Sequence, residues 1–466
     1  MTYRGSLVVG KAHIDTLIDA DRALTRVIYA YLVSATFWLV CGSLVGEYLG
    51  IRFDLPDLGV HRWLSFGRLR PVHTNAVFWG WASLGMTALA LYVVPRTSQR
   101  RLYSISLAWV SLLLINAAVV SGVLLLVGGI NNGAQEYREF VWPSMGLFVA
   151  ALVLLSYDLY QTVARRSIEE IYISNWYILA AFLWTLVVAV TAYLPWFQYG
   201  LGETVIQGYY MHMGVGMWFT PMVLGITYYS LPKLLNKPIY SYALGVLAFW
   251  TQMVFYALIG AHHYVFSPIP WWLQTIAIIF SVGMLVPLVA GTGNFLLTMR
   301  GSGRTIGRSY SLPFILVGVL YYFLASGQGS LEALRSLNRL WHFTNFTIAH
   351  SHMTLYGFVS FLIWGGVYGL FPRLTGREPP HLLVGVHFWF ALVGVLIYGT
   401  ALMIGGTEQG RLWISGAPFI KSVTLLSSYW LWRAVGGSLM FFAHLVFAYN
   451  VWCMRPGSGE SAGEQS

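Results

Sequence analysis

Twelve apolar stretches run through this sequence, and they constrain its fold more than any other feature. A helix needs roughly 20 mostly apolar residues to cross a lipid bilayer, and most of the stretches approach or exceed that length. Their approximate bounds are 26–47, 70–95, 104–127, 142–162, 174–195, 206–230, 240–263, 271–298, 312–326, 344–371, 381–405 and 432–453. Because short connections join them, we predict an all-α integral membrane protein, a bundle of twelve transmembrane helices forming one domain over residues 1–455. Residues 456–466 are rich in Gly, Ser and Glu, which predicts a disordered tail.

Composition excludes several other classes of protein. Only 9% of the residues are charged and 57% are hydrophobic, whereas a soluble domain has about 25% charged residues. A water-soluble enzyme, a nucleic-acid binder and a disordered scaffold are therefore excluded. The net charge of +10 comes from short basic clusters between apolar runs. The two cysteines, Cys41 and Cys453, are too few for a cysteine-rich metal site, and neither belongs to a CxxCH motif for covalent haem attachment.

The basic clusters predict how the helices are oriented. Lys and Arg follow the second, fourth, sixth, eighth and tenth stretches, and none follows the fifth or seventh. The residues concerned are Arg96, Arg100, Arg101, Arg165, Arg166, Lys233, Lys237, Arg300, Arg304, Arg308, Arg373 and Arg377. Cytoplasmic loops carry an excess of Lys and Arg, so both termini, and with them the tail, are expected in the cytoplasm. Some Arg also follows the first, ninth and eleventh stretches, which weakens this bias without reversing it.

Six histidines occupy unexpected positions in or at the ends of these apolar stretches. Ionisable side chains are costly inside a membrane and usually mark function. The six are His73, His212, His262, His263, His350 and His352. With the predicted orientation, all six lie at a similar depth in the outer part of the membrane. The isolated His387 and His444, and the loop residues His13, His61 and His381, are expected to be structural.

Spacing along the helices divides the six histidines into groups. His350 and His352 point about 200° apart around a helix, so one helix can serve two metal centres. His262 and His263 are adjacent near a helix end, where a fraying turn lets both reach one ion. His212 from another helix would complete a three-nitrogen site. Imidazole ligands suit copper, zinc or iron, and not calcium or magnesium.

Five segments, in this order, carry a resemblance that covers nearly the whole chain. They read FGRLRPVHTNAVFWG, EYREFVWP, YYMHMG, YSYALGVLAFWTQMVFYALIGAHHY and HFTNFTIAHSHMTLYG. These segments resemble the catalytic subunit of haem–copper oxygen reductases, most of all the C-type (cbb3-type) cytochrome c oxidases. The resemblance implies a haem–copper oxidase bundle in the bacterial inner membrane, with membrane-anchored c-type cytochrome subunits as partners. It also implies reduction of O₂ to water with electrons from a c-type cytochrome, coupled to proton uptake and translocation.

The same resemblance implies the ligands of three cofactors. His73 and His352 match the axial ligands of a low-spin haem b, and His350 matches the proximal ligand of a high-spin haem b. The three remaining histidines match the ligands of copper B: His212, His262 and His263.

Further residues match roles around these cofactors. Tyr256 matches the active-site tyrosine, which in this family is covalently bonded to the histidine that corresponds to His212. Glu136 and Glu139 match acidic residues that help to hold a calcium ion near the haem propionates. Arg70 is expected to pair with a propionate, because Arg binds carboxylates in bidentate fashion.

A proton path is predicted through hydroxyl groups and water, because Asp158 is almost the only carboxylate within the spans. It would use Thr227, Tyr228, Tyr240, Ser241, Tyr242 and Tyr322 and end at Tyr256. Two positions depart from the family's pattern. Gly245 replaces a channel serine, and Gln328 replaces a glutamate near the proximal haem ligand, which should raise the potential of that haem.

Two alternatives remain. Nitric oxide reductase has the same six histidines with non-haem iron in place of copper. Its cytochrome c-dependent form has a glutamate where this chain has Gly216, and it lacks the tyrosine found here at Tyr256, so both positions favour copper and dioxygen. A twelve-span transporter with histidine proton relays fits the composition, but it does not explain six histidines at one depth.

Overall fold

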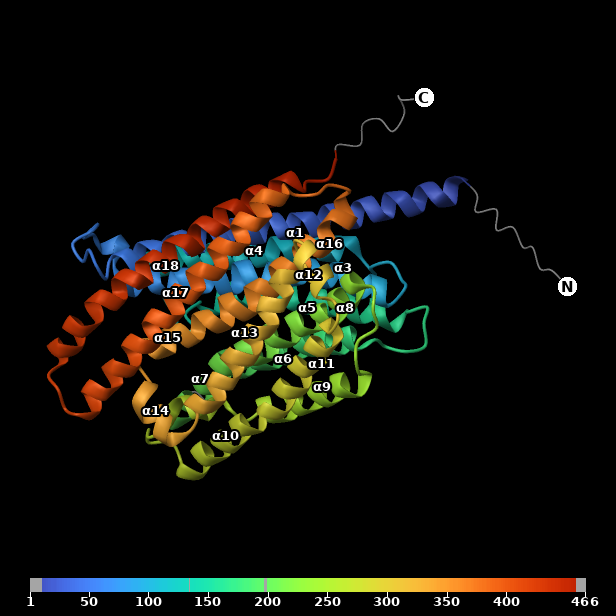
Figure 1. Cartoon of the computed structure of the whole chain (residues 1–466). Helices are drawn as coiled ribbons and strands as arrows, with labels where there is room; N and C mark the ends of the chain where they lie inside the picture. The colour runs from blue at the N-terminus through green and yellow to red at the C-terminus, as the bar shows by residue number, and fades with distance from the viewer. Residues whose placement is uncertain (1–10, 134, 197–198, 458–466) are drawn as a thin grey trace.

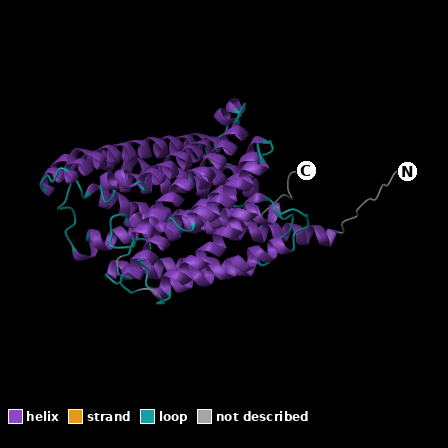
Figure 2. Ribbon diagram, turned by 90° about the horizontal axis from the view of Figure 1, so that it is seen from below, coloured by secondary structure: helices purple, strands orange, loops and turns teal. Residues whose placement is uncertain are grey.

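The structure is a computed structural model that describes residues 11–133, 135–196 and 199–457. Within these ranges every regular element is a helix and none is a strand (Figure 2), which confirms the all-α prediction. The tail predicted over 456–466 lies outside the described residues from 458 onwards. The helices are α1 (Lys11–Ile51), η1 (Arg62–Leu64), α2 (Phe66–Asn75), η2 (Ala76–Ala82), α3 (Ser83–Thr97), α4 (Ile105–Gly128), α5 (Trp142–Ala164), α6 (Ile173–Tyr193), α7 (Leu201–Met213), η3 (Gly214–Phe219), α8 (Thr220–Leu235), α9 (Tyr242–Tyr256), η4 (Gly260–Tyr264), α10 (Trp271–Gly283), α11 (Leu285–Met299), α12 (Gly303–Arg308), α13 (Leu312–Glu332), α14 (Arg335–Trp341), α15 (Asn345–His352), η5 (Met353–Ser360), α16 (Phe361–Thr375), α17 (His381–Ile414) and α18 (Phe419–Cys453).

Ten helices or unbroken helical runs among the described residues are long and apolar enough to cross a membrane, so this is a multi-pass membrane protein. The predicted count of twelve is not confirmed. The stretch 206–230 lies in the run α7–η3–α8, which is not among the ten. The stretch 240–263 is helical only as α9, which has 15 residues, before the chain turns into the 3-10 helix η4. The helix predicted over 312–326 continues as α13 to Glu332.

The bundle has its first and last helices side by side (Figure 1). α18 packs along both α17 and α1. The start of α1 and the end of α18 lie at the same end of the bundle, on the right of Figure 1. α9, α10 and α11 lie on the opposite side of the molecule from α18.

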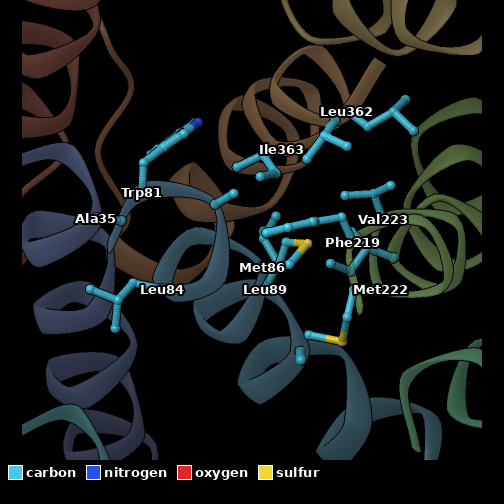
Figure 3. Packing of buried hydrophobic residues seen from close by; sticks show 14 of the residues in the cluster. Ala35, Trp81, Leu84, Met86, Leu89, Phe219, Met222, Val223, Leu362 and Ile363 are labelled. Atoms are coloured by element: carbon cyan, nitrogen blue, oxygen red, sulfur yellow. The ribbon is translucent and has the colours of Figure 1, made fainter. Parts of the chain in front are cut away.

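The centre of the bundle is formed by two runs, α2–η2–α3 and α15–η5–α16. Their most apolar windows are 94% and 89% buried, whereas that of α4 is only 39% buried. Figure 3 shows the core between them, where Met86 and Leu89 of α3 meet Met222 of α8 and Ile363 of α16. The outer helices expose apolar side chains instead, as a lipid-facing surface requires. The two central runs also carry His73, His350 and His352, whose side chains are only partly buried.

Three of the helical runs contain a π-helical segment, and each segment begins within three residues after a candidate ligand. η2 follows His73, η3 follows His212 and η5 follows His352. A π-helical turn holds an extra residue and is found mostly at functional sites. The local backbone therefore departs from a regular α-helix where the histidine side chains are presented.

Candidate metal centre

His73 and His352 face each other across the gap between α2 and α15. Their ring centroids are 6.4 Å apart, and the ring planes differ by only 15°. The Nδ1 atom of His73 lies 2.8 Å from the carbonyl of Gly42, and that of His352 lies 2.9 Å from the carbonyl of Ile348. Each Nε2 atom therefore remains available. Two nitrogen–metal bonds of about 2 Å, together with the two ring radii, account for the separation, so the pair fits the two axial positions of one haem iron.

The close approach of α1 holds His73 in place. A Cβ atom at Gly46 would lie 2.5 Å from Cε1 of His73, so a glycine is needed where the imidazole crosses α1. Gly42, one turn earlier, supplies the carbonyl that bonds Nδ1. On the other side, Tyr398 of α17 packs on His352 with ring centroids 4.5 Å apart. Hydrogen bonding and packing thus orient both imidazoles.

A cavity of about 260 Å³ surrounds this histidine pair. Its lining includes Arg70 and Arg433, which place two guanidinium groups where carboxylates could bind. Arg70 lies 2.7 Å from Glu136 in an ion pair, so the residue predicted to bind a propionate has a protein partner here. Arg433 lies in α18 and stacks over the ring of Phe53. Sequence reasoning missed it, although an arginine within the predicted stretch 432–453 was the available signal.

Glu136 and Glu139, predicted as calcium ligands, have different surroundings. Glu136 is half-buried and is paired with Arg70. Glu139 is buried, and its Oε2 atom accepts a hydrogen bond of 2.9 Å from Asn75. Its Oε1 atom has no hydrogen-bond partner among the described residues. Burial raises the pKa of the Glu139 carboxyl to about 7. Its free oxygen fits a cation ligand, since a calcium site is built from oxygen atoms.

His212, His262 and His263 converge on one point. One nitrogen of each imidazole lies within 4.8 Å of those of the other two, and no other such group of His, Cys, Asp or Glu occurs among the described residues. His212 Nδ1 is 2.7 Å from His263 Nε2. The 3-10 helix η4 carries His262 and His263, so the turn expected to direct both toward one ion is present. The donor set fits a copper, zinc or iron ion.

Ser281 fixes the orientation of one of these imidazoles. Its hydroxyl oxygen is 2.6 Å from Nδ1 of His262 and donates to the carbonyl of Ala277. His262 Nδ1 is therefore the donor, which leaves its Nε2 for a metal. The backbone carbonyl of Ser281 accepts a hydrogen bond of 2.8 Å from Ser330 of α13. Such supporting partners orient metal ligands and strengthen metal binding.

Tyr256 lies against His212, with ring centroids 5.2 Å apart. Its ring fills the space above Gly216, where a Cβ atom would come within 1.5 Å of Cε1 of Tyr256. The tyrosine and a side chain at position 216 are therefore mutually exclusive in this arrangement. Gln252, one turn before Tyr256, is buried and donates to the carbonyl of Gly216 at 3.2 Å. Sequence reasoning missed Gln252.

Two side chains of α13 lie next to the imidazole of His350. Its Nδ1 atom lies 3.1 Å from Oε1 of Gln328 and 3.5 Å from Oε1 of Glu332, one helical turn further on. The Nε2 atom of Gln328 lies 3.3 Å from the sulfur of Met403. Gln328 thus directs its carbonyl oxygen toward the imidazole, as expected of a residue beside the proximal ligand. Glu332 was missed because the predicted span ended at residue 326.

The residues predicted for proton transfer separate into buried and exposed ones. Tyr228 and Tyr322 are buried, whereas Tyr240 and Tyr242 are exposed. Thr227 is also buried, and its hydroxyl donates to the backbone of its own helix.

Asn294 connects two of these positions and was missed at the sequence level. Its Nδ2 atom donates to the carbonyl of Ser241 at 2.8 Å and lies 3.5 Å from the hydroxyl of Tyr228. The Ser241 hydroxyl accepts from the backbone of Leu244 and caps α9. A Cβ atom at Gly245 would lie 3.4 Å from the Tyr228 hydroxyl, so the missing serine would have stood beside Tyr228.

Two further buried residues in the spans, His387 and Asp158, have hydrogen-bond partners that link neighbouring helices. Tyr368 lies 2.8 Å from Nδ1 of His387 and accepts from Asn450 at 2.9 Å. Asp158 accepts from the backbone of Ser104 at 2.7 Å, where α4 begins. These contacts agree with a structural role for His387.

Comparison with known proteins covers most of the chain. The family model for cytochrome c and quinol oxidase polypeptide I matches residues 26–439. Over 457 residues the chain is 31% identical to the cbb3-type cytochrome c oxidase subunit CcoN1 of Stutzerimonas stutzeri, covering 92% of this chain and 94% of that one. It is 30% identical over 443 residues to a cytochrome c oxidase subunit 1 homolog of Agrobacterium tumefaciens (strain T37), covering 90% and 82%.

The fold has a counterpart among solved structures. A chain from the cryo-EM structure of a heme-copper terminal oxidase dimer aligns with a TM-score of 0.75, over 93% of this chain and 84% of that one. At 15% identity, this likeness concerns the fold alone. The family match and the two relatives lead to one conclusion: this chain belongs to the cytochrome c and quinol oxidase polypeptide I family and resembles the cbb3-type subunits within it.

Proposed function

We propose that this chain is the catalytic subunit of a terminal respiratory oxidase that reduces O₂ to water with electrons from a c-type cytochrome. The observation that carries the proposal is the arrangement of the six histidines. Two face each other across a cavity, three converge within 4.8 Å, and the sixth lies on the helix that also carries one of the facing pair. No single metal ion accounts for this arrangement.

The proposed ligands combine that geometry with the roles that the family resemblance implies. His73 and His352 would hold a low-spin haem b, because their Nδ1 atoms are tied to carbonyls and their Nε2 atoms stay available. His350 would hold a high-spin haem b. The three converging histidines would hold copper B: His212, His262 and His263. When bound, these groups supply electron transfer and the binding and activation of dioxygen.

The chain's own residues supply orientation and protons. Tyr256 places its phenol ring beside His212, where it can hold and release a proton at the reaction centre. Asn294 contacts both the Tyr228 hydroxyl and the backbone carbonyl of Ser241 in a partly buried polar group, which supports a proton route from the inner surface. Tyr322 continues that route among buried residues, while the exposed Tyr240 and Tyr242 belong to its entry.

A cation site completes the proposal. The Oε1 atom of Glu139 is buried and has no hydrogen-bond partner among the described residues. Glu136 lines the cavity around the histidine pair. These two observations support a calcium ion held by both glutamates. Arg433 joins Arg70 as a proposed partner of the haem propionates, because both guanidinium groups line the same cavity.

The surroundings of the subunit are part of the proposal. We expect twelve crossings of the bacterial inner membrane, with the run α7–η3–α8 and the run from α9 to η4 adding to the ten candidate spans. The described start of α1 and end of α18 lie at one end of the bundle, so both termini would lie on one side of the membrane, and the excess of Lys and Arg in the loops makes that side the cytoplasm. Residues 1–455 would act as one catalytic domain, followed by a cytoplasmic tail. Electrons would arrive through membrane-anchored c-type cytochrome subunits.

Nitric oxide reduction with a non-haem iron is the alternative, and the geometry at Gly216 argues against it. A glutamate there would have to occupy the space that the Tyr256 ring fills. The two relatives compared above are also named as oxidases.

Turnover by the purified protein tests the proposal. With a reduced c-type cytochrome as donor, we expect consumption of O₂ that exceeds any consumption of nitric oxide. His350→Ala should abolish both the turnover and the high-spin haem signal, whereas the exposed His381→Ala should retain both. Full oxidase activity in His350→Ala would refute the assignment of His350.

A further inference from the structure

The partner of the proximal imidazole is a glutamine where the family's pattern has a glutamate. Gln328 places a neutral amide oxygen 3.1 Å from the Nδ1 atom of His350. A metal-bound histidine usually donates its second ring N–H to a carboxylate, carbonyl or water, and a carboxylate raises the basicity of the ligand. The nearest carboxyl group in the described part of the chain is that of Glu332.

Glu332 lies one helical turn after Gln328, so both side chains are on the same face of α13. Its Oε1 atom is 3.5 Å from His350 Nδ1. That distance exceeds an ordinary N–H···O bond, whose length is about 2.9 Å. The same Oε1 atom is buried and accepts no hydrogen bond among the described residues. A buried oxygen of this kind requires a donor, and the imidazole N–H is the donor within reach.

The surrounding charges leave Glu332 free to interact with the imidazole. Within the described ranges, His350 is the only basic side chain within 4 Å of its carboxylate. Arg335 follows on the next helix, but its guanidinium donates to Thr275 at 2.8 Å and lies 3.9 Å from the ring of Trp271. Glu332 is therefore not paired with the closest arginine in the sequence.

We infer that Glu332 is a positioning residue for the proximal ligand. Its carboxyl group shares the Nδ1–H of His350 with Gln328 and supplies from the next helical turn the carboxyl oxygen that position 328 lacks. Gln328 alone should raise the potential of the high-spin haem, and Glu332 should offset that rise. This inference rests on the proposed function, since it requires a haem bound by His350.

Spectroelectrochemistry of the purified, haem-loaded protein tests the inference. Glu332→Gln replaces the carboxyl group by an amide with almost no change of shape, and we expect about a tenfold shift of the reduction equilibrium toward the reduced high-spin haem, or about 59 mV for one electron. Resonance Raman spectra should show a weaker iron–histidine bond. The double variant Gln328→Glu/Glu332→Gln returns the carboxylate to position 328, and it should restore both readings. Glu378→Gln, at an exposed glutamate that pairs with His381, is the control.

The possible outcomes separate the inference from the proposed function. A wild-type protein without a haem on His350 would overturn both. If wild type holds the haem while Glu332→Gln leaves the potential and the iron–histidine band unchanged, only the inference fails. Should Glu332→Gln lose the haem, recovery in the double variant would support the inference, and loss in both variants would assign Glu332 to packing and overturn it.

Discussion

Ser281→Ala should weaken metal binding at the three-histidine site without changing any ligand. The hydroxyl of Ser281 lies 2.6 Å from Nδ1 of His262, and both side chains are buried, with 2% and 7% of their surface exposed. The substitution therefore leaves a buried imidazole N–H without an acceptor, at a cost of about 1–3 kcal/mol. It also frees the ring to rotate. Loss of such a supporting partner typically lowers metal affinity about 10- to 100-fold.

Competition with copper chelators of graded affinity measures this effect, with copper and iron counted in the recovered protein. Ser111→Ala is the matched control, because Ser111 is equally buried in α4 and its hydroxyl has no hydrogen-bond partner among the described residues. Haem content should be the same in both variants. A Ser281→Ala protein that holds copper as tightly as wild type would refute the idea that Ser281 orients His262.

Two further predictions concern Gly46, which lies against His73, and the buried Glu139. Gly46→Ala would place a Cβ atom 2.5 Å from Cε1 of His73, so it should deplete the low-spin haem in the optical spectrum. Gly50→Ala is the control, because the space around its Cβ atom is open. Equal spectra for the two variants would contradict the idea that His73 requires a glycine at position 46. Calcium binding should weaken as the pH falls below about 7. The reason is that burial raises the pKa of Glu139 to about 7, and protonation removes the charge of this ligand. Calcium titrations at several pH values measure the effect. Affinity that is independent of pH, or unchanged in Glu139→Gln, would contradict the second prediction.

Much of the metal centre could be predicted from the sequence because its ligands are ionisable side chains in apolar stretches, where such side chains are rare. Six imidazoles in apolar stretches are visible without a structure, and the pairs at 262–263 and 350–352 limit which ring can face which partner. The structure brings His73 to His352, and it brings His212 to His262 and His263, as the resemblance implied.

The contacts around the ligands could not be predicted in the same way. Glu332 and Ser281 act across helix interfaces, and no spacing along one helix indicates which neighbour a side chain will meet. The π-helical segments were also missed, because one extra residue in a turn leaves composition and apolar length unchanged. The count of twelve spans is not confirmed by helix length, since the stretch 240–263 includes η4, where the chain leaves the α-helix to present two histidines.

Metal and haem analysis of the purified chain tests the central claim most directly. The six-histidine arrangement predicts two haems of the b type and one copper for each chain, with one haem that binds CO after reduction. A third iron outside the haems with no copper, or a colourless protein without haem, would contradict it.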